Sequence, residues 1–359
     1  MTSPLVSVVV PVFNAERHLG ECLQSLFAQT LQAIEIVVVD DGSTDRSAGL
    51  LSEAAADDRL RVLTLAENRG VSAARNAGVA AAHGAYVAFV DADDVVSPTM
   101  YEALYQAARD AAADIVFCGI RVVGPDGVVI SSEPPPLSPG HVYSRACVHE
   151  VLHRAWELRL LWYPVRSIYR RTLLIANEVR FDEGIRKGED SLFNLQALLV
   201  PARVTAVGEV LYEYRKHASS ATACPLASES DNLERLGRSV TELYSRNGFD
   251  DRAFLDFARH VLRSDLPAAL VLLCSHRAAL GEVRALLDTE TVRTAFRIQR
   301  ISRLGVPLRA QAVLILARLR LVRLLVLVLR LAHGERAAVR GSAGSPLPPW
   351  RSDRSRWTG

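Results

Sequence analysis

Three aspartates lie together in the segment AYVAFVDADD (85–94), directly after an apolar run of the kind found in buried strands. Asp91 and Asp93 occupy alternate positions, which in an extended chain point to the same side. Carboxylate oxygens are the ligands that Mg²⁺ and Mn²⁺ prefer, commonly with phosphate oxygens completing the shell. The pattern therefore favours a divalent-cation site, because a bound cation removes the repulsion between the carboxylates. The alternative is a solvated acidic loop with Asp94 near the cap of the next helix.

A second acidic pair, Asp40 and Asp41, ends another apolar run in VVVDDGSTD. Gly42 allows a tight turn here, and Ser43 or Thr44 is suited to capping the following helix. A purely structural turn would explain this segment. Carboxylates at the same place could also accept hydrogen bonds from a nucleobase N–H or a ribose hydroxyl, as the acidic residue of dinucleotide-binding folds does. The residues alone leave both interpretations open.

Two further segments place polar and charged residues at predicted helix starts. In ENRGVSAARNAG, Asn68 precedes a helix N-terminus, which favours anions, and Arg75 on the first turn could bridge a diphosphate or pair with an aspartate. In RKGED, Glu189 and Asp190 lead a helix, where acidic side chains are favourable. One of these two could instead be a general base aimed at the cation site. Spacing does not separate the alternatives.

The elements that would position these residues alternate along the first half of the chain. Short apolar runs stand at 5–10, 34–39, 60–65 and 85–90, and helical stretches at 16–29, 45–56, 71–82 and 98–112. Strict alternation predicts βαβ units and an α/β fold with a mostly parallel sheet flanked by helices. Ligands bind outside the carboxyl ends of such strands, which is where the unusual polar residues stand.

The remainder of the chain changes character twice. Further strands are expected at 114–122, 127–131 and 203–217, a helix at 145–158, and a loop that leads into a helix over 181–200. From about residue 226 the β pattern gives way to helical periodicity. We therefore expect an α/β catalytic domain over 1–222, a helical module over 223–335, and a disordered tail rich in Gly, Pro, Ser and Arg over 336–359.

Composition narrows the class of protein. The chain has 359 residues, 49% of them hydrophobic, and a formal net charge of +2, which is typical of a folded protein and argues against a dedicated nucleic-acid binder. Five scattered cysteines without a CxxC pair predict buried, reduced thiols. The N-terminus lacks a basic start, and its apolar run breaks at Pro11, so we expect no signal peptide and a cytoplasmic protein.

The last predicted helix is intensely apolar and also basic. A helix over about 306–333 would carry several arginines on one face, and its uncharged run 324–329 is far too short to span a bilayer. Such a helix could lie on an anionic membrane surface with its arginines reaching the phosphates. It could also pack against the helical module or a second subunit. We favour peripheral contact with the inner face of the cell membrane; the oligomeric state is not predicted.

Taken in order, these segments resemble glycosyltransferase family 2 over about residues 5–220. The matching text is VSVVVPVFNAERHLGECLQSLFAQT, EIVVVDDGSTD, ENRGVSAARNAGVAAAHGAYVAFVDADD, RFDEGIRKGEDSLFN and LYEYRKHASS. The resemblance implies a GT-A fold, with the helical module following it, and inverting transfer of a sugar from a nucleotide donor, commonly a UDP-sugar, to a hydroxyl. Separately, the peripheral membrane placement expected for 306–333 would suit an acceptor that is a cell-envelope or lipid-linked glycan.

The resemblance also assigns roles to residues on the donor side. A uridine pocket would be lined by four residues with a fifth beside them: Pro11, Phe13, Glu16 and Asp41, with Asp40 adjacent. Asn68 and Arg75 would contact the nucleotide or its phosphates. Phe13 stands where a tyrosine is frequent in the family, which keeps ring stacking but removes a hydroxyl.

The remaining assignments concern the metal and the chemistry. Asp91 and Asp93 would form the D-x-D pair for Mg²⁺ or Mn²⁺, with Asp93 as the direct ligand. Asp190 would be the catalytic base and Glu189 its neighbour. His217, with Ser220 in the same YRxHxxS pattern, would reach the metal or the diphosphate.

Two other functions and one departure from the family pattern bear on this assignment. A sugar nucleotidyltransferase would need a glycine-rich, lysine-bearing loop after the first strand, where this chain has PVFNAERHLG. A non-catalytic nucleotide-sugar-binding module is disfavoured by the intact carboxylates. Arg166 stands where many family members have lysine, which leaves contacts to the acceptor there unassigned.

Overall fold

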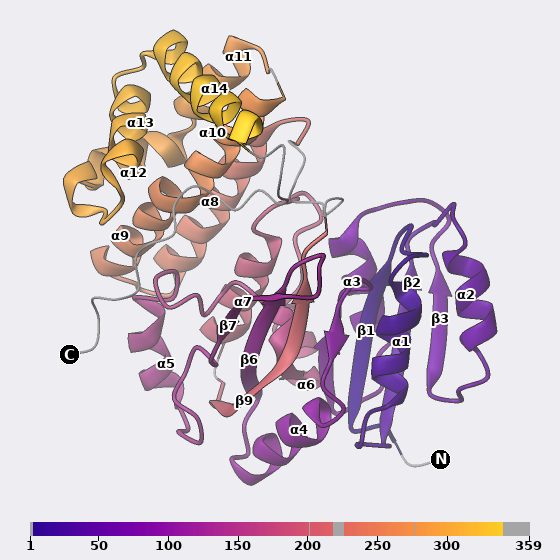
Figure 1. Cartoon of the computed structure of the whole chain (residues 1–359). Coiled ribbons are helices and arrows are strands. Elements are labelled where there is room, and N and C mark those ends of the chain that lie inside the picture. Colours follow the sequence, from indigo (N-terminus) through magenta and orange to yellow (C-terminus); the bar gives the residue numbers. More distant parts are fainter. Residues whose placement is uncertain (1–2, 201, 218–225, 277, 340–359) are drawn as a thin grey trace. The chain divides into compact units, whose positions relative to one another are not determined.

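The computed structural model describes residues 3–200, 202–217, 226–276 and 278–339, without the side chains of Arg145 and 333–339. The chain divides into two compact units, Met1–His217 and Ala218–Gly359 (Figure 1). The division falls five residues before the domain end expected at 222. Each unit is described by itself below.

Unit 1 is built on a sheet whose first half follows the predicted alternation. The parallel strands are β1 (Val6–Val12), β2 (Ile34–Asp40), β3 (Leu60–Thr64) and β4 (Tyr86–Phe89), in the order β3-β2-β1-β4. The helices between and after them are α1 (Leu19–Phe27), α2 (Ser47–Ala54), α3 (Val71–Ala81) and α4 (Met100–Asp110). The central strands β1, β2 and β4 are buried along nearly their whole length, as their continuous apolar runs require. All four strand predictions are confirmed.

The second half of the sheet is mixed. Its strands are β5 (Val95–Val96), β6 (Ile115–Val123), β7 (Val129–Glu133), β8 (Ser167–Arg170) and β9 (Val204–Arg215). The order continues from β4 through β8, β6 and β9 to β5, with β7 beside β6. Of these pairings only β6 with β9 is parallel. The GT-A-type fold is confirmed, and its parallel arrangement is confined to β1–β4 and the β6–β9 pair.

Further elements of unit 1 lie between β7 and β9 along the chain. They are α5 (Arg145–Leu152), the short 3-10 turn η1 (Pro164–Arg166), α6 (Arg171–Ala176) and α7 (Glu189–Leu199). An aromatic cluster joins α7 to β4, because Phe181 stacks on Phe193 at 4.1 Å between ring centroids and both rings meet Phe89 edge-on. This cluster fixes the start of α7, where the predicted base lies.

The cysteines are mostly as predicted. Cys22, Cys118 and Cys274 are buried free thiols. Cys147 is exposed on α5, so the prediction of burial is wrong there. Cys224 lies outside the described residues.

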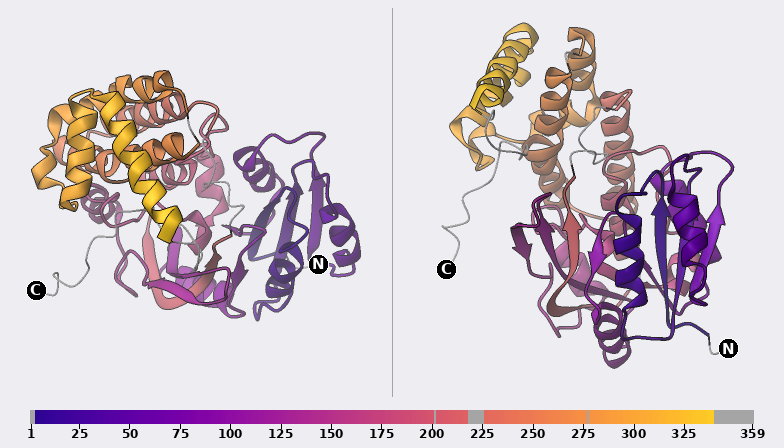
Figure 2. Two further views of the ribbon diagram at one scale, coloured as in Figure 1. Left: turned by 45° about the horizontal axis from the view of Figure 1, so that its top comes forward. Right: turned by 45° about the vertical axis from the view of Figure 1, so that its right-hand side comes forward.

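The regular elements described in unit 2 are all helices (Figure 2). Its elements are α8 (Glu229–Arg246), α9 (Asp251–His260), η3 (Val261–Asp265), α10 (Leu266–Ser275), α11 (Leu280–Asp288), α12 (Glu290–Ile298), η4 (Ile301–Arg303), α13 (Leu308–Arg318) and α14 (Val322–Val339). Among the helices that the structure describes, none has the length and apolar character needed to cross a bilayer. The predicted tail overlaps α14 up to Val339, and 340–359 lie outside the described residues.

The single helix predicted over 306–333 is wrong. The chain breaks between α13 and α14, where Arg320 has φ of 59° and the amide of Leu321 donates to the carbonyl of Leu316. Because neither proline nor glycine stands at the break, local composition gave no sign of it. The two helices pack against each other instead of forming one rod.

Candidate active site

The two aspartates that end β2 hold neighbouring loops in place. One Asp40 carboxylate oxygen accepts the amide of Ser43 at 2.9 Å. The Asp41 carboxylate accepts the amides of Arg69 at 2.8 Å and Gly70 at 2.7 Å, immediately before α3. Both aspartates are buried. They therefore shape the loops at the carboxyl edge of the sheet, and the structural interpretation of this pair is supported directly.

The predicted helix cap at Ser43 or Thr44 is wrong, because α2 begins at Ser47 with Arg46 as its N-cap. Ser43 instead accepts the amide of Asn14, and the Asn14 side-chain oxygen accepts the amide of Thr44 at 2.8 Å. These bonds join the loop after β1 to the loop after β2.

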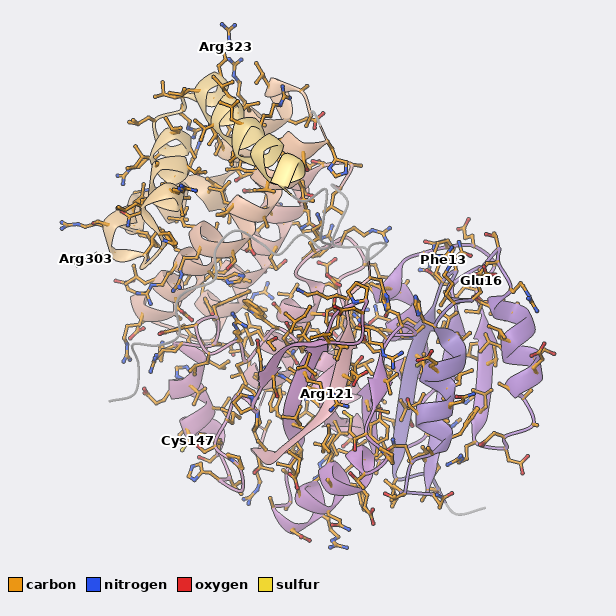
Figure 3. All side chains as sticks on the ribbon, viewed as in Figure 1. Phe13, Glu16, Arg121, Cys147, Arg303 and Arg323 are labelled. Carbon is orange, nitrogen blue, oxygen red and sulfur yellow. The ribbon has the colours of Figure 1, made fainter. Side chains whose placement is uncertain are left out.

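The other predicted nucleotide residues lie at the end of β1, on the loop after it or, for Asn68, on the loop between β3 and α3. Pro11 is half-buried in β1, and the Phe13 side chain is 47% exposed just beyond it. Glu16 is exposed and accepts the amide of Arg46 at 3.0 Å. Phe13 and Glu16 stand at the same end of the sheet (Figure 3). Asn68 is exposed, and its amide nitrogen lies 3.0 Å from the place that a Cβ on Gly42 would take, so these loops are in close contact.

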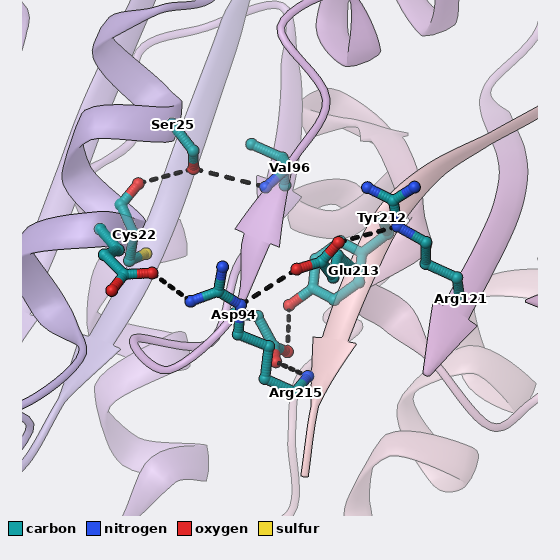
Figure 4. Close-up of polar contacts among 9 residues, drawn as sticks. Cys22, Ser25, Asp94, Val96, Arg121, Tyr212, Glu213 and Arg215 are labelled. Atoms are coloured by element: carbon teal, nitrogen blue, oxygen red, sulfur yellow. Dashed lines mark hydrogen bonds and ion pairs between the residues drawn. The ribbon is translucent and has the colours of Figure 1, made fainter. Parts of the chain in front are cut away.

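The acidic segment after β4 is a tight turn rather than the extended chain that was predicted. The amide of Asp94 donates to the carbonyl of Asp91 at 3.0 Å. Asp94 is fully buried, and its two carboxylate oxygens accept the Tyr212 hydroxyl at 2.6 Å and the Arg215 amide at 2.7 Å (Figure 4). The N-cap of α4 is Thr99 and Asp94 is buried, so the alternative of a solvated acidic loop with Asp94 near that cap does not describe Asp94. Asp94 ties the turn to β9.

Tyr212 is a site residue that the sequence did not reveal. Its hydroxyl lies 3.3 Å from the amide of Asp91 as well as contacting Asp94. The only signal in the sequence was its place in LYEYRKH, shortly before His217. The tyrosine thereby orients the carboxylates of the turn from a strand more than a hundred residues away.

Arg75 connects the predicted metal carboxylate to the predicted base. Its guanidinium is buried and donates to Asp91 and to Asp190, each at 2.7 Å. It also lies over the Phe181 ring, 5.0 Å from the centroid. Of the two sequence alternatives, pairing with aspartate is the one present, and two aspartates share the pairing.

The environment raises the affinity of both acidic residues at the α7 start for protons. Burial raises the pKa of Asp190, although the positive charge of Arg75 opposes that rise. Burial, followed by the neighbouring charge of Asp190, raises the pKa of Glu189. A carboxylate with a raised pKa is a stronger proton acceptor, which suits a general base.

The loop before α7 is bonded to α3 by Asn76, a residue that no motif in the sequence marked out. Asn76 accepts the amide of Phe181 at 3.0 Å and donates to the carbonyl of the same residue at 2.9 Å. Arg69 pairs with Glu183 at 3.1 Å. Asn76 follows Arg75 directly, so one turn of α3 contacts both Asp190, the predicted base, and the loop before α7.

The oxygen-rich side chains of the turn are chemically suited to Mg²⁺ or Mn²⁺. Asp93 is half-buried, and burial together with the Asp91 charge raises its pKa, which a bound cation would reverse. Among the described residues, no three His, Cys, Asp or Glu side chains form a metal-binding group. Asp91 and Asp93 would thus leave most coordination positions to phosphate oxygens and water.

Of the two residues predicted to act just after β9, the structure describes His217 but not Ser220. His217 stacks on His18 with ring centroids 3.9 Å apart. Burial, with the nearby His217, lowers the pKa of His18. Ser220 lies outside the described residues.

Comparison with known proteins identifies the family. The model of "Glycosyl transferase family 2" matches residues 7–160. The chain is 36% identical over 300 residues to the uncharacterized glycosyltransferase EpsJ of Bacillus subtilis, covering 82% of this chain and 86% of EpsJ. This chain belongs to glycosyltransferase family 2. It is 30% identical to the glycosyltransferase GlyG of Streptococcus pneumoniae, covering 67% of this chain and 81% of GlyG.

A solved structure in this fold class supports the same architecture. The crystal structure of Staphylococcus aureus TarS 1–349 in complex with UDP-GlcNAc superposes with a TM-score of 0.66 and 20% identity, covering 98% of this chain and 97% of that one. At that identity the likeness concerns the fold. The family-2 glycosyltransferase described here therefore has a GT-A unit followed by helices, as the neighbouring structure does.

Arg166, the departure from the family-2 pattern, is an internal residue of this glycosyltransferase. Its side chain is 1% exposed and donates to the carbonyl of Arg159 at 2.7 Å. The guanidinium also lies over the Tyr163 ring, 5.4 Å from its centroid. Arg166 therefore supports the packing around η1 and is not presented to an acceptor.

Proposed function

We propose that this enzyme transfers a sugar, with inversion, from a UDP-sugar to a hydroxyl group of a cell-envelope or lipid-linked glycan, with Mg²⁺ or Mn²⁺ bound at the donor. The observation that carries the proposal is the shared guanidinium of Arg75, which contacts Asp91 and Asp190 together. A diphosphate held near Asp91 would then have its sugar close to Asp190. One carboxylate for the donor and one for the acceptor is the minimum for a single displacement.

The reaction balances with the residues at hand. The acceptor oxygen attacks the anomeric carbon, the bond from that carbon to the diphosphate oxygen breaks, and the acceptor proton passes to Asp190. A divalent ion held by Asp91 and Asp93 would offset the charge that develops on the diphosphate. Arg75 adds a fixed positive charge beside the same carboxylate. Inversion needs no covalent nucleophile.

The donor nucleotide would bind on the joined loops after β1 and β2. The exposed ring of Phe13 offers a stacking surface for a base, with half-buried Pro11 two residues before it, exposed Glu16 three residues after it and exposed Asn68 on the loop after β3. Asp40 and Asp41 support this surface through the backbone bonds described above. That TarS was crystallised with UDP-GlcNAc supports a UDP-sugar as donor.

The class of acceptor rests on the relatives. ExoO of Rhizobium meliloti, 26% identical over 315 residues, is named a succinoglycan biosynthesis protein. TarS of S. aureus, 29% identical over 227 residues, is named a poly(ribitol-phosphate) β-N-acetylglucosaminyltransferase. Both names concern the synthesis or glycosylation of a polymer, which supports a glycan acceptor of the proposed class.

The test is a panel of UDP- and other nucleotide sugars with Mn²⁺, measured by UDP release and product formation. Asp190→Asn should lower the rate of sugar transfer by a factor of about 10²–10⁴, which in practice abolishes it, while metal-dependent UDP binding persists. Asp110→Asn is the matched control, because Asp110 is a surface residue of α4 paired with Arg109.

Normal turnover by Asp190→Asn would remove the base assignment. Donor binding without UDP release from any sugar would favour a binding module, and pyrophosphate release from UTP and a sugar phosphate would favour a nucleotidyltransferase.

A further inference from the structure

Unit 2 concentrates exposed apolar side chains on one short stretch. Of the fifteen large hydrophobic residues that are exposed in the described chain, seven fall within 308–331. Single exposed hydrophobic residues are normal on protein surfaces, whereas a cluster indicates an interaction site. With the arginines between them they form the leucine–arginine surface: Leu308, Ile315, Leu319, Leu321, Leu324, Leu327 and Leu331, with Arg309, Arg318, Arg323 and Arg330.

The opposite faces of α13 and α14 are buried in the core of unit 2. α13 buries Ala310, Val313, Leu314 and Ala317, and α14 buries Val322, Leu325, Val326 and Leu329. These faces pack α13 against α14, and α14 against α10 and α11. The exposed leucines therefore take no part in the core packing of unit 2.

The break at Arg320 sharpens this surface. The turn between the helices presents Leu319 at 61% exposure and Leu321 at 46%, with Leu324 following on the first turn of α14. Arg323 projects away from the ribbon beside them (Figure 3). A turn with leucines at its tip and arginines around them can insert its apolar groups while its charges stay at the level of phosphates.

Charge decides which partner fits. Residues 291–334 contain nine arginines and no Asp or Glu, a local charge of +9 in a chain whose net charge is +2. Within the described chain, Arg320 pairs with Asp288, whereas no ion pair is recorded for Arg309, Arg318, Arg323 or Arg330. A second copy seated on this surface by a two-fold axis would bring arginines against arginines. An anionic phospholipid surface supplies both the opposite charge and an apolar layer beneath it.

We propose that the leucine–arginine surface docks the protein on anionic phospholipid bilayers as a peripheral contact. The proposal does not depend on the sugar-transfer reaction, since lipid binding needs neither donor nor metal. The membrane proposal can therefore be wrong while the proposed function is right, and the proposed function can be wrong while the membrane proposal is right.

The test is flotation of the full chain with vesicles of phosphatidylcholine alone and of phosphatidylcholine with about 30% of the anionic lipid phosphatidylglycerol. The wild type should float only with the anionic vesicles, and added salt should release it. Arg309→Gln/Arg323→Gln should lower the partition coefficient about 30-fold, as expected for two basic residues near a charged surface. Arg109→Gln/Arg154→Gln removes two exposed arginines from unit 1 and should leave flotation unchanged.

The apolar contribution is tested by a second pair. Leu324→Gln/Leu327→Gln keeps helix-forming residues and should also reduce flotation, whereas Leu158→Gln/Ile175→Gln in unit 1 should not. Far-ultraviolet circular dichroism checks that every variant is folded. Absence of wild-type flotation, equal flotation with neutral vesicles, or equal loss in the control pairs would overturn the proposal. A change of oligomeric state in Leu324→Gln/Leu327→Gln, seen by light scattering with flotation intact, would show a protein interface instead.

Discussion

The two charged regions of this enzyme are built in opposite ways. In the candidate active site the charges face one another: Arg75 is enclosed between two aspartates, and Asp94 is buried between a hydroxyl and an amide. On the leucine–arginine surface the charges face outward beside exposed leucines. Pairing and burial fix atoms to positions, as catalysis requires, whereas outward charge serves contact with a large partner whose details vary. Substitutions should therefore act on chemistry in the first region and on attachment in the second.

The largest expected effect comes from breaking the central pair. Arg75→Met keeps an unbranched apolar side chain but leaves Asp91 and Asp190 without the guanidinium between them, and should lower kcat by at least about 10²-fold. The free energy of unfolding should fall by about 2–3 kcal/mol, somewhat less than for a fully buried pair because both aspartates retain some exposure. Urea unfolding and donor-saturated kinetics measure the two effects.

Arg69→Met is the control for that experiment, because its pair with Glu183 has both side chains about half exposed. Its effect on stability should stay within about 1 kcal/mol. Equal losses in the two variants would mean that burial of the Arg75 pair is not what matters.

Asp94→Ala should act mainly on stability. The substitution leaves the Tyr212 hydroxyl and the Arg215 amide without their acceptor, and each such loss costs about 1–3 kcal/mol. We expect a decrease of about 2–4 kcal/mol in the free energy of unfolding, with weaker Mn²⁺-dependent UDP binding. Asp126→Ala, in the turn before β7, should change stability little; a wild-type value for Asp94→Ala would show that the anchor is dispensable.

Asn76→Ala tests whether the loop before α7 needs its attachment to α3. Loss of both bonds to Phe181 should lower kcat about tenfold with little change in the KM for donor, because the base is misplaced while the nucleotide loops are untouched. Asn177→Ala removes a local bond to Leu173 and should leave both constants unchanged. A change in KM alone would contradict a positioning role.

The smallest expected effect is a shift along the pH axis. Asp190 must be unprotonated to accept a proton, and burial raises its pKa. On acidification, kcat should therefore begin to fall at a pH above about 3.9, the pKa of an ordinary aspartate. Arg75 lowers the pKa of Asp190, so in Arg75→Met this fall should move to still higher pH. An unchanged profile in that variant would separate the titrating group from Asp190.

The first half of the sheet could be predicted because each of its strands is specified by the residues of that strand alone. Strands buried on both faces need continuous apolar runs, and the polar residues that follow them stand out in the sequence. The strands β5 and β8 have only two and four residues, and they exist through pairing with β9, β4 and β6. Such pairing is a tertiary effect that no short window of sequence contains.

The site residues follow the same division. Their types indicated acid, base and cation chemistry, but their partners are 16 and 115 residues away from Arg75 and 118 away in the Tyr212–Asp94 bond. For that reason the sequence left open whether Arg75 met phosphate or aspartate, and it missed Tyr212 and Asn76. The break at Arg320 was hidden because its residues favour helix, and only the packing of α14 on α10 and α11 gives a reason for the turn.

The anchoring of the acidic turn to β9 also limits how this enzyme can be re-engineered. A chimaera that takes residues 91–94 from another family member but keeps the local β9 inherits carboxylates whose hydroxyl and amide partners were shaped for a different turn. Grafts that transfer the turn together with positions 212–215 should retain function where single-loop swaps lose it.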